Sequence, residues 1–158
     1  MRRSPFTIVS GGQTGVDRGA LDAALERGIP CGGWCPRRRQ AEDGRIPERY
    51  PLRELDGGYG ARTLRNVLDS DGTLLIYFAR LEGGTEQTLA HCLAHRRPYR
   101  LVDASVVTPR AAGALAAKFV EEGGIRVLNV AGPRASKQPR ARSYAREALL
   151  HALDALDR

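Results

Sequence analysis

The chain has 158 residues, 42% hydrophobic and 27% charged, which is the composition of one soluble domain long enough to bury a core. Its 25 Lys and Arg residues outnumber its 18 Asp and Glu residues, giving a net charge of +7, and all but two of these cations are Arg. No segment approaches the roughly 18 apolar residues of a membrane span, and the apolar run after the basic start, residues 6–9, is too short for a signal peptide, so we expect a cytoplasmic protein.

The predicted elements alternate between strand and helix. Residues 6–10 form a β-type run, and residues 17–27 have the apolar spacing of a helix that ends at Gly28. Residues 29–60 are rich in Pro and Gly and are predicted to be mostly irregular. Further helices are predicted over 62–68, 86–95, 109–122 and 142–156, and further strands over 73–78, 98–102 and 125–130. This alternation predicts an α/β fold, a parallel sheet with helices on both faces, in a single domain over residues 1–158.

Three predicted strand-to-helix turns carry chemistry suited to anions, and ligands of open α/β sheets bind at the edge where such turns lie. The first turn, residues 10–17, has three glycines that let the backbone approach an anion, and its free N–H groups precede a helix. It matches neither the Walker A nor the G-x-G-x-x-G pattern. A tight turn with Asp17 as the helix N-cap is the alternative.

The second and third turns add hydroxyls and cations. Residues 83–88 (GGTEQT) place Thr85 and Thr88 where both can face a ligand. The alternative is that Thr85 caps the helix and neither threonine binds a ligand. Residues 129–137 include Arg134, which can hold two anionic oxygens, although a solvated basic loop explains them too. The candidate ligand-binding residues of the three turns are Gly11, Gly12, Gln13, Thr14, Gly15, Gly83, Gly84, Thr85, Thr88, Arg134 and Ser136.

The turns and the segments between them resemble a known family. The resemblance is carried by Ser10-Gly-Gly-Gln-Thr-Gly-Val-Asp17, Gly32-Gly-Trp-Cys-Pro36, Ala41-Glu-Asp-Gly44, Ile46-Pro47, Arg62-Thr63, Asn66-Val67, Asp69-Ser-Asp-Gly-Thr73, Gly83-Gly-Thr85 and Asn129-Val-Ala-Gly-Pro-Arg-Ala-Ser-Lys137. Together these motifs resemble the molybdenum-cofactor carrier proteins, a circularly permuted branch of the SLOG superfamily of Rossmann-like nucleotide-binding proteins.

The resemblance implies a Rossmann-like fold, a homo-oligomer and a pocket for a small anionic ligand. In the family this pocket is thought to hold the pterin phosphate and the molybdenum oxo group of the molybdenum cofactor, and a nucleotide is the alternative ligand. Carried over, residues 11–15 would form one wall, and Gly83, Gly84, Thr85 and Thr88 would cradle the phosphate. The expected function is a carrier or storage protein for a phosphorylated planar cofactor.

One departure from the wider superfamily bears on catalysis. The phosphoribohydrolase branch uses a Pro-Gly-Gly-x-Gly-Thr-x-x-Glu motif with a catalytic glutamate, whereas residues 83–88 lack the second glycine and have Thr88. We therefore lean towards a binding protein. Two alternatives stay open: a nucleotide hydrolase with Glu42, Asp43 or Asp71 as its acid or base, and a DNA-binding module.

Other reactive residues have structural and functional interpretations of similar weight. Asp69 and Asp71 can hold a metal or a ribose hydroxyl, or simply form a turn, and we include Asp71 among the candidate ligand-binding residues. The His91-Cys92-x-x-His95 pattern resembles a zinc helix but has no evident third ligand, so no metal site is expected. Three cysteines, an odd number, do not indicate a disulfide framework.

The basic residues near the C-terminus and the lone tryptophan complete the candidates. Trp34 can stack on a heterocycle or fill the core. The run Arg134, Lys137, Arg140, Arg142 and Arg146 has only Tyr144 among it, which argues against nucleic acid. Of all the arginines, Arg134 first, then Arg18 and Arg62, are the candidates for direct contact with the anion.

Overall fold

The computed structural model describes residues 6–157. The basic N-terminal residues that were considered in predicting a cytoplasmic location lie within residues 1–5, outside the described range. Its central sheet has five strands, all parallel, in the order β2-β1-β9-β7-β8. These strands are β1 (Thr7–Val9), β2 (Cys31–Gly32), β7 (Gly72–Tyr77), β8 (Tyr99–Asp103) and β9 (Val127–Ala131). The α-helices are α1 (Val16–Arg27), α2 (Gly58–Leu68), α3 (Gly83–Ala94), α4 (Pro109–Gly123) and α5 (Ala141–Leu156).

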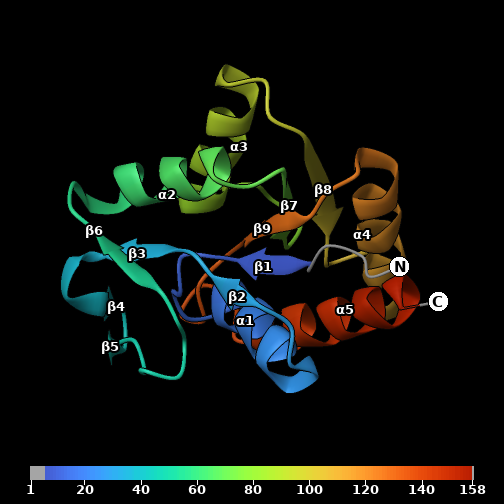
Figure 1. Ribbon diagram of the computed structural model, residues 1–158, viewed down its shortest axis with the longest axis horizontal. Coiled ribbons are helices and arrows are strands. Elements are labelled where there is room, and N and C mark those ends of the chain that lie inside the picture. The colour runs from blue at the N-terminus through green and yellow to red at the C-terminus, as the bar shows by residue number, and fades with distance from the viewer. Residues whose placement is uncertain (1–5, 158) are drawn as a thin grey trace.

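The helices cover both faces of the sheet (Figure 1). Helix α5 packs between α1 and α4 on one face, and α2 packs beside α3 on the other. The core lies mainly under the first group, where strand residues Ile8, Leu74, Ile76, Leu128 and Val130 are at most 1% exposed. Alternate positions of these strands point to this core because side chains on a strand alternate between its faces. The predicted α/β fold, with a parallel sheet and helices on both faces, is therefore confirmed.

The segment expected to be irregular contains several very short elements. They are β3 (Trp34–Pro36), which pairs with β6 (Arg53–Leu55), the 3-10 turn η1 (Arg37–Arg39), and β4 (Gln40–Ala41), which pairs with β5 (Gly44–Arg45). Strands of two or three residues are too short to show a periodic pattern in the sequence. Strand β2 of the same segment forms an edge of the main sheet.

Arg39 holds this segment together from inside. Its guanidinium donates hydrogen bonds to the carbonyl oxygens of Ile46, Pro47, Tyr50 and Leu52, at distances of 2.7 to 3.2 Å. The Arg39 side chain is only 7% exposed. Buried carbonyl groups need donors, so one arginine supplies what regular strands would otherwise provide.

The connections that follow β9 and β7 run to opposite faces of the sheet. Helices α1 and α5, which follow β1 and β9, lie on one face, whereas α3, which follows β7, lies on the other. The segments leaving the neighbouring strands β9 and β7 therefore diverge at their carboxyl ends, the arrangement in which open α/β sheets bind ligands. No helix within residues 6–157 is long and apolar enough to cross a membrane.

Candidate functional site

A cavity of about 480 Å³ lies at the carboxyl ends of β7 and β9. The α2–α3 layer forms one side of it and the segment after β9 forms the other. The lining residues are Gln13, Asp17, Tyr59, Arg62, Thr63, Tyr77, Phe78, Arg80, Glu82, Gly83, Gly84, Thr85, Gln87, Thr88, Ala131, Gly132, Pro133, Arg134, Lys137 and Gln138. This set brings together parts of all three turns that the sequence analysis selected.

The N-terminus of α3 opens into the cavity. The helix begins at Gly83, three residues before the predicted start at Glu86, so the two glycines belong to its first turn. Glycine disfavours helix interiors, so the sequence alone does not mark these two residues as helical. The first N–H groups of a helix have no acceptor within it and carry its partial positive charge, and a side chain built on Gly83 or Gly84 would meet no atom within 4 Å. The backbone is thus accessible to an anion here.

Two buried threonines follow these glycines on α3. Thr85 is 6% exposed and Thr88 is 3% exposed, and both line the cavity. The Thr88 hydroxyl donates a hydrogen bond to the Gly84 carbonyl at 2.8 Å, which leaves its oxygen able to accept but not to donate. Thr85 and the backbone N–H groups are therefore the donors that the first turn of α3 offers to the cavity.

Arg62 and Asp17 form a charged pair in the cavity wall. Arg62 Nη1 lies 3.7 Å from Asp17 Oδ2, and the Tyr59 ring centroid lies 5.4 Å from the guanidinium carbon. Arg62 Nε is buried and has no hydrogen-bond partner among residues 6–157. An unpaired buried donor is costly unless a ligand or water satisfies it. Because Arg62 also lines the cavity, its guanidinium lies within reach of a ligand there.

Burial dominates the electrostatics of Asp17. It raises the pKa of Asp17 to about 6, against the opposing effects of Arg62, of the Gln13 and Gly11 N–H groups and of Arg18. The Gln13 N–H donates to Asp17 Oδ2 at 3.2 Å, so this carboxylate also closes the first turn. Helix α1 starts at Val16 with Gly15 as N-cap, and Asp17 lies within its first turn rather than capping it.

Replacing Asp17 by Asn is expected to change how stability depends on pH. A carboxyl group whose folded-state pKa lies above its unfolded value makes the folded state less stable as pH rises through that range. From about 3.8 in the unfolded chain to about 6, this amounts to about 2 kcal/mol between pH 4.5 and 7.5. The unfolding free energy of Asp17→Asn minus that of the wild type should rise by this amount over the interval. Urea unfolding of both proteins at several pH values measures this difference in unfolding free energy. A difference that does not change with pH would contradict a raised pKa of the buried Asp17 carboxyl group.

Gln13 and the glycines of the first turn have different roles. Gln13 lines the cavity. Gly11 lies directly under Arg62, since a side-chain carbon there would come within 1.7 Å of Arg62 Nη1. A side-chain carbon at Gly12 would collide with the Leu52 side chain, and one at Gly15 would collide with the backbone of the segment after β9. These three glycines therefore let neighbouring elements approach closely, a role that sequence inspection alone does not separate from ligand contact.

The remaining residues of the first and third turns are joined by Glu42. Its carboxylate accepts hydrogen bonds from the Thr14 hydroxyl and from the hydroxyl (2.5 Å) and N–H (3.1 Å) of Ser136, and it lies 3.4 Å from Arg134 Nε. Desolvation opposes the charge on Glu42, but the hydrogen bonds from Ser136 and Thr14 and the charge of Arg134 outweigh it and hold its pKa below the usual range. Thr14 and Ser136 are thus engaged by a protein carboxylate, and neither lines the cavity.

Asp43 and Asp71 are also held by donors of the protein. Arg18 makes two hydrogen bonds with Asp43, at 2.6 and 2.8 Å, and these keep the pKa of Asp43 below its usual value. Asp71 precedes β7, at the amino ends of the strands, whereas the cavity lies at their carboxyl ends. Its carboxylate accepts hydrogen bonds from the N–H groups of Arg126 and Val127. Its position corrects our expectation that it would lie with the other candidates, because it comes before the strand and not after it. None of Glu42, Asp43 and Asp71 lines the cavity.

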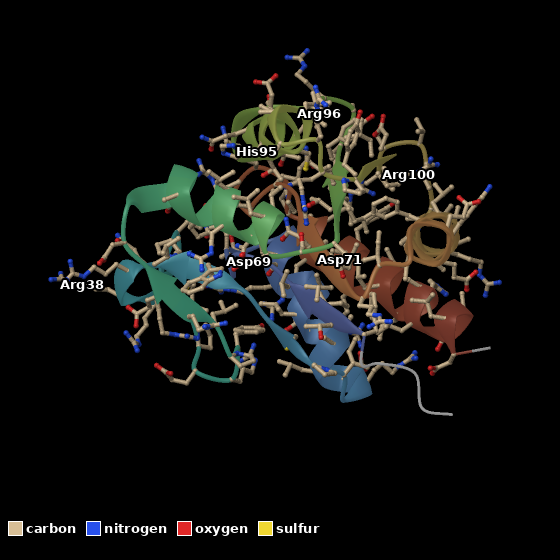
Figure 2. The ribbon with its side chains drawn as sticks, turned by 45° about the horizontal axis from the view of Figure 1, so that its top comes forward. Arg38, Asp69, Asp71, His95, Arg96 and Arg100 are labelled. Atoms are coloured by element: carbon tan, nitrogen blue, oxygen red, sulfur yellow. The ribbon has the colours of Figure 1, made fainter. Side chains whose placement is uncertain are left out.

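The other reactive residues lie outside the cavity. Figure 2 shows Asp69 and Asp71 between α2 and β7, and His95 at the far end of α3. Asp69 accepts a hydrogen bond from the Trp34 indole at 2.8 Å, and Arg53 and Arg65 lie over the Trp34 ring, so this ring is engaged by the protein. Among residues 6–157, no cluster of His, Cys, Asp and Glu could hold a metal ion.

Much of the C-terminal basic run is neutralised. Arg142 pairs with Asp22 and Arg146 with Glu26, each at 2.8 Å, and Arg134 faces Glu42. Arg140 lies over the Phe78 ring, and Lys137 lines the cavity. Three of the five cations of this run, Arg134, Arg142 and Arg146, are thus paired with carboxylates.

Several cavity residues were missed by the sequence analysis. Tyr59 lies one helical turn before Arg62 and would have been found had the predicted helix begun at Gly58. Phe78, Arg80 and Glu82 lie in the segment between β7 and α3, and only this place after a strand marks them in the sequence. The missed aromatic residues give the cavity flat apolar surfaces beside its cations.

Comparisons with known proteins agree with the fold and the motifs. Residues 8–153 match a family model described as the circularly permutated YpsA SLOG family. The chain is also similar to a crystal structure described as a "putative molybdenum carrier protein" from Syntrophus aciditrophicus SB, with 42% sequence identity and a TM-score of 0.91 over 96% of this chain and 98% of that chain. No curated protein matches the chain. Because the family model spans nearly the whole described range, the chain belongs to the circularly permuted YpsA branch of the SLOG family.

Proposed function

We propose that this protein binds a phosphorylated planar cofactor in the cavity between β7 and β9, and that the molybdenum cofactor is the cargo it carries. The observation that carries the proposal is that an accessible helix N-terminus at Gly83–Thr85 and the cation Arg62 line one cavity of about 480 Å³. The first feature suits a phosphate group. The similarity to a protein described as a molybdenum carrier supports the choice of cargo.

The remaining lining residues suit the rest of such a ligand. The lining holds four cations, Arg62, Arg80, Arg134 and Lys137, and two acids, Asp17 and Glu82, so the cavity favours a negatively charged molecule. Tyr59, Tyr77 and Phe78 supply surfaces on which a flat ring system can pack.

The donor set also indicates how a molybdenum group would be held. The lining residues include no thiol and no imidazole, which are the protein ligands that transition metals prefer. N–H, hydroxyl and guanidinium donors would hold oxygen atoms attached to the metal. This arrangement suits reversible carriage of the intact cofactor.

A binding role is better supported than the hydrolase alternative that uses Glu42, Asp43 or Asp71. The three carboxylates considered as acid or base, Glu42, Asp43 and Asp71, accept hydrogen bonds from the protein and lie outside the cavity lining. A general acid or base has to reach the reacting atoms. The homo-oligomeric state and the cytoplasmic location remain predictions.

The proposal is tested by thermal shift and calorimetry with the molybdenum cofactor, molybdate, AMP, ADP-ribose and NAD. At equal concentration, the phosphorylated planar compounds should raise the melting temperature more the more tightly they bind, and the molybdenum cofactor should raise it most. Molybdate alone should have a smaller effect, because it lacks the ring system. If no anionic compound stabilises the protein, the proposed function is wrong. If the protein releases a product from any of the nucleotides, the hydrolase alternative is supported instead.

A further inference from the structure

Glu42 occupies a group of donors that has the composition of an oxyanion site. One backbone N–H and one hydroxyl of Ser136, the hydroxyl of Thr14 and the guanidinium of Arg134 all converge on its carboxylate. Such combinations of N–H, hydroxyl and guanidinium donors bind phosphate-like anions in proteins. Glu42 is therefore an internal anion at the place where the first and third turns were expected to bind an external one.

These donors adjoin the cavity. Gln13 and Arg134 both line the cavity, and both also contact Glu42: Gln13 Oε1 accepts the Glu42 N–H at 3.0 Å. The Ala135 N–H, from the same turn, donates to the Thr14 hydroxyl oxygen at 3.1 Å, which orients that hydroxyl towards Glu42. The donors are thus held in place by the protein around Glu42 and next to the ligand cavity.

Glu42 is attached in a way that allows it to leave. It lies in the turn between β4 and β5, two strands of two residues each, and its side chain is 24% exposed. The neighbouring Asp43 remains paired with Arg18 through two hydrogen bonds, so the turn keeps one attachment when Glu42 moves. A partly exposed carboxylate on a short hairpin can be solvated by water when an incoming anion takes its donors.

We propose that Thr14, Arg134 and Ser136 form a second anion subsite, and that a tetrahedral oxyanion of the ligand displaces Glu42 from it. The inference rests on the proposed binding of a phosphorylated ligand and extends it, since the ligand then carries a second anionic group besides the phosphate at α3. The subsite is formed by residues that the sequence analysis selected for anion binding. Glu42 raises the selectivity of this subsite, because only an anion that binds these donors better than the tethered carboxylate can replace it.

The test is a titration with inorganic phosphate followed by amide resonances of the ¹⁵N-labelled protein. In Glu42→Ala, the Ser136 and Ala135 amides should respond to phosphate with an affinity at least about tenfold higher than in the wild type, because a competing like charge is gone. Glu42→Gln, which keeps the side-chain size, should act in the same direction and serves if Glu42→Ala does not fold. Glu48→Ala, which removes an exposed acid paired with Arg45 in the same segment, should match the wild type.

The α3 site provides the internal reference. If the Gly84 amide responds to phosphate while the Ser136 amide of both Glu42 variants does not, the subsite is refuted and the proposed function stands. If neither amide responds in any variant, both proposals are refuted. A response of Ser136 that is equal in the wild type and the variants would also overturn the displacement of Glu42.

Discussion

Replacing Gly84 by Asp is expected to lower the affinity for a phosphorylated ligand by about 100-fold while leaving the fold intact. A side-chain carbon at Gly84 meets no atom within 4 Å, so an aspartate fits in the first turn of α3. Its carboxylate would lie where the ligand phosphate is proposed to bind, and placing like charges together costs several kcal/mol, of which about 2.7 kcal/mol corresponds to 100-fold. Calorimetry with AMP, or with whichever phosphorylated compound of the panel binds best, measures the loss.

The same substitution should not destabilise the protein. An acidic side chain in the first turn of a helix is favourable by about 0.3 to 1 kcal/mol, so the melting temperature without ligand should stay the same or rise. Gly84→Ser is the matched control, because it adds a side chain without charge and should bind within about threefold of the wild type. Unchanged affinity in Gly84→Asp would place the phosphate elsewhere in the cavity.

Replacing Gly15 by Ala is expected to destabilise the protein by about 3 kcal/mol. Gly15 has φ 83°, and a side-chain carbon there would lie 2.3 Å from the Pro133 carbonyl oxygen and 2.8 Å from Arg134 Cα. With ψ −132°, this backbone lies in a region that glycine occupies far more readily than alanine, which costs about 1 to 3 kcal/mol, and overpacking costs about 1 to 3 kcal/mol more. Urea unfolding of the ligand-free protein measures the sum.

This result separates a structural glycine from a ligand-binding one. Gly28 is the matched control, since it also has a positive φ (65°) but an added side-chain carbon there meets no atom within 4 Å. Gly28→Ala should therefore cost only the backbone contribution of about 1 to 2 kcal/mol. Equal losses for the two variants would show that the contact between the first turn and the segment after β9 contributes nothing.

Features of the site that depend on neighbouring residues in the sequence could be predicted, whereas those that depend on contacts between distant segments could not. The helix after β7 was expected, but its start was placed at Glu86 because two glycines argue against helix locally; the structure begins it at Gly83. Asp71 was selected for its carboxylate, yet it lies before its strand and accepts two backbone N–H groups of the neighbouring chain segment. Thr14 and Ser136, 122 residues apart, were both selected as anion binders, and no local pattern indicated that Glu42 lies between them.

The order of strands and helices, the parallel sheet and the motifs of the SLOG family follow from the chain itself, because hydrophobic periodicity and glycine turns are local properties. The position of the cavity depends on the strand order, which inserts β9 between β1 and β7 and sends α3 to the opposite face from α5. The pairing of Arg62 with Asp17 and of Glu42 with Ser136 depends on contacts between distant segments. Such contacts are set by the packing of the whole fold, and they decide which of the polar residues selected from the sequence are free to meet a ligand.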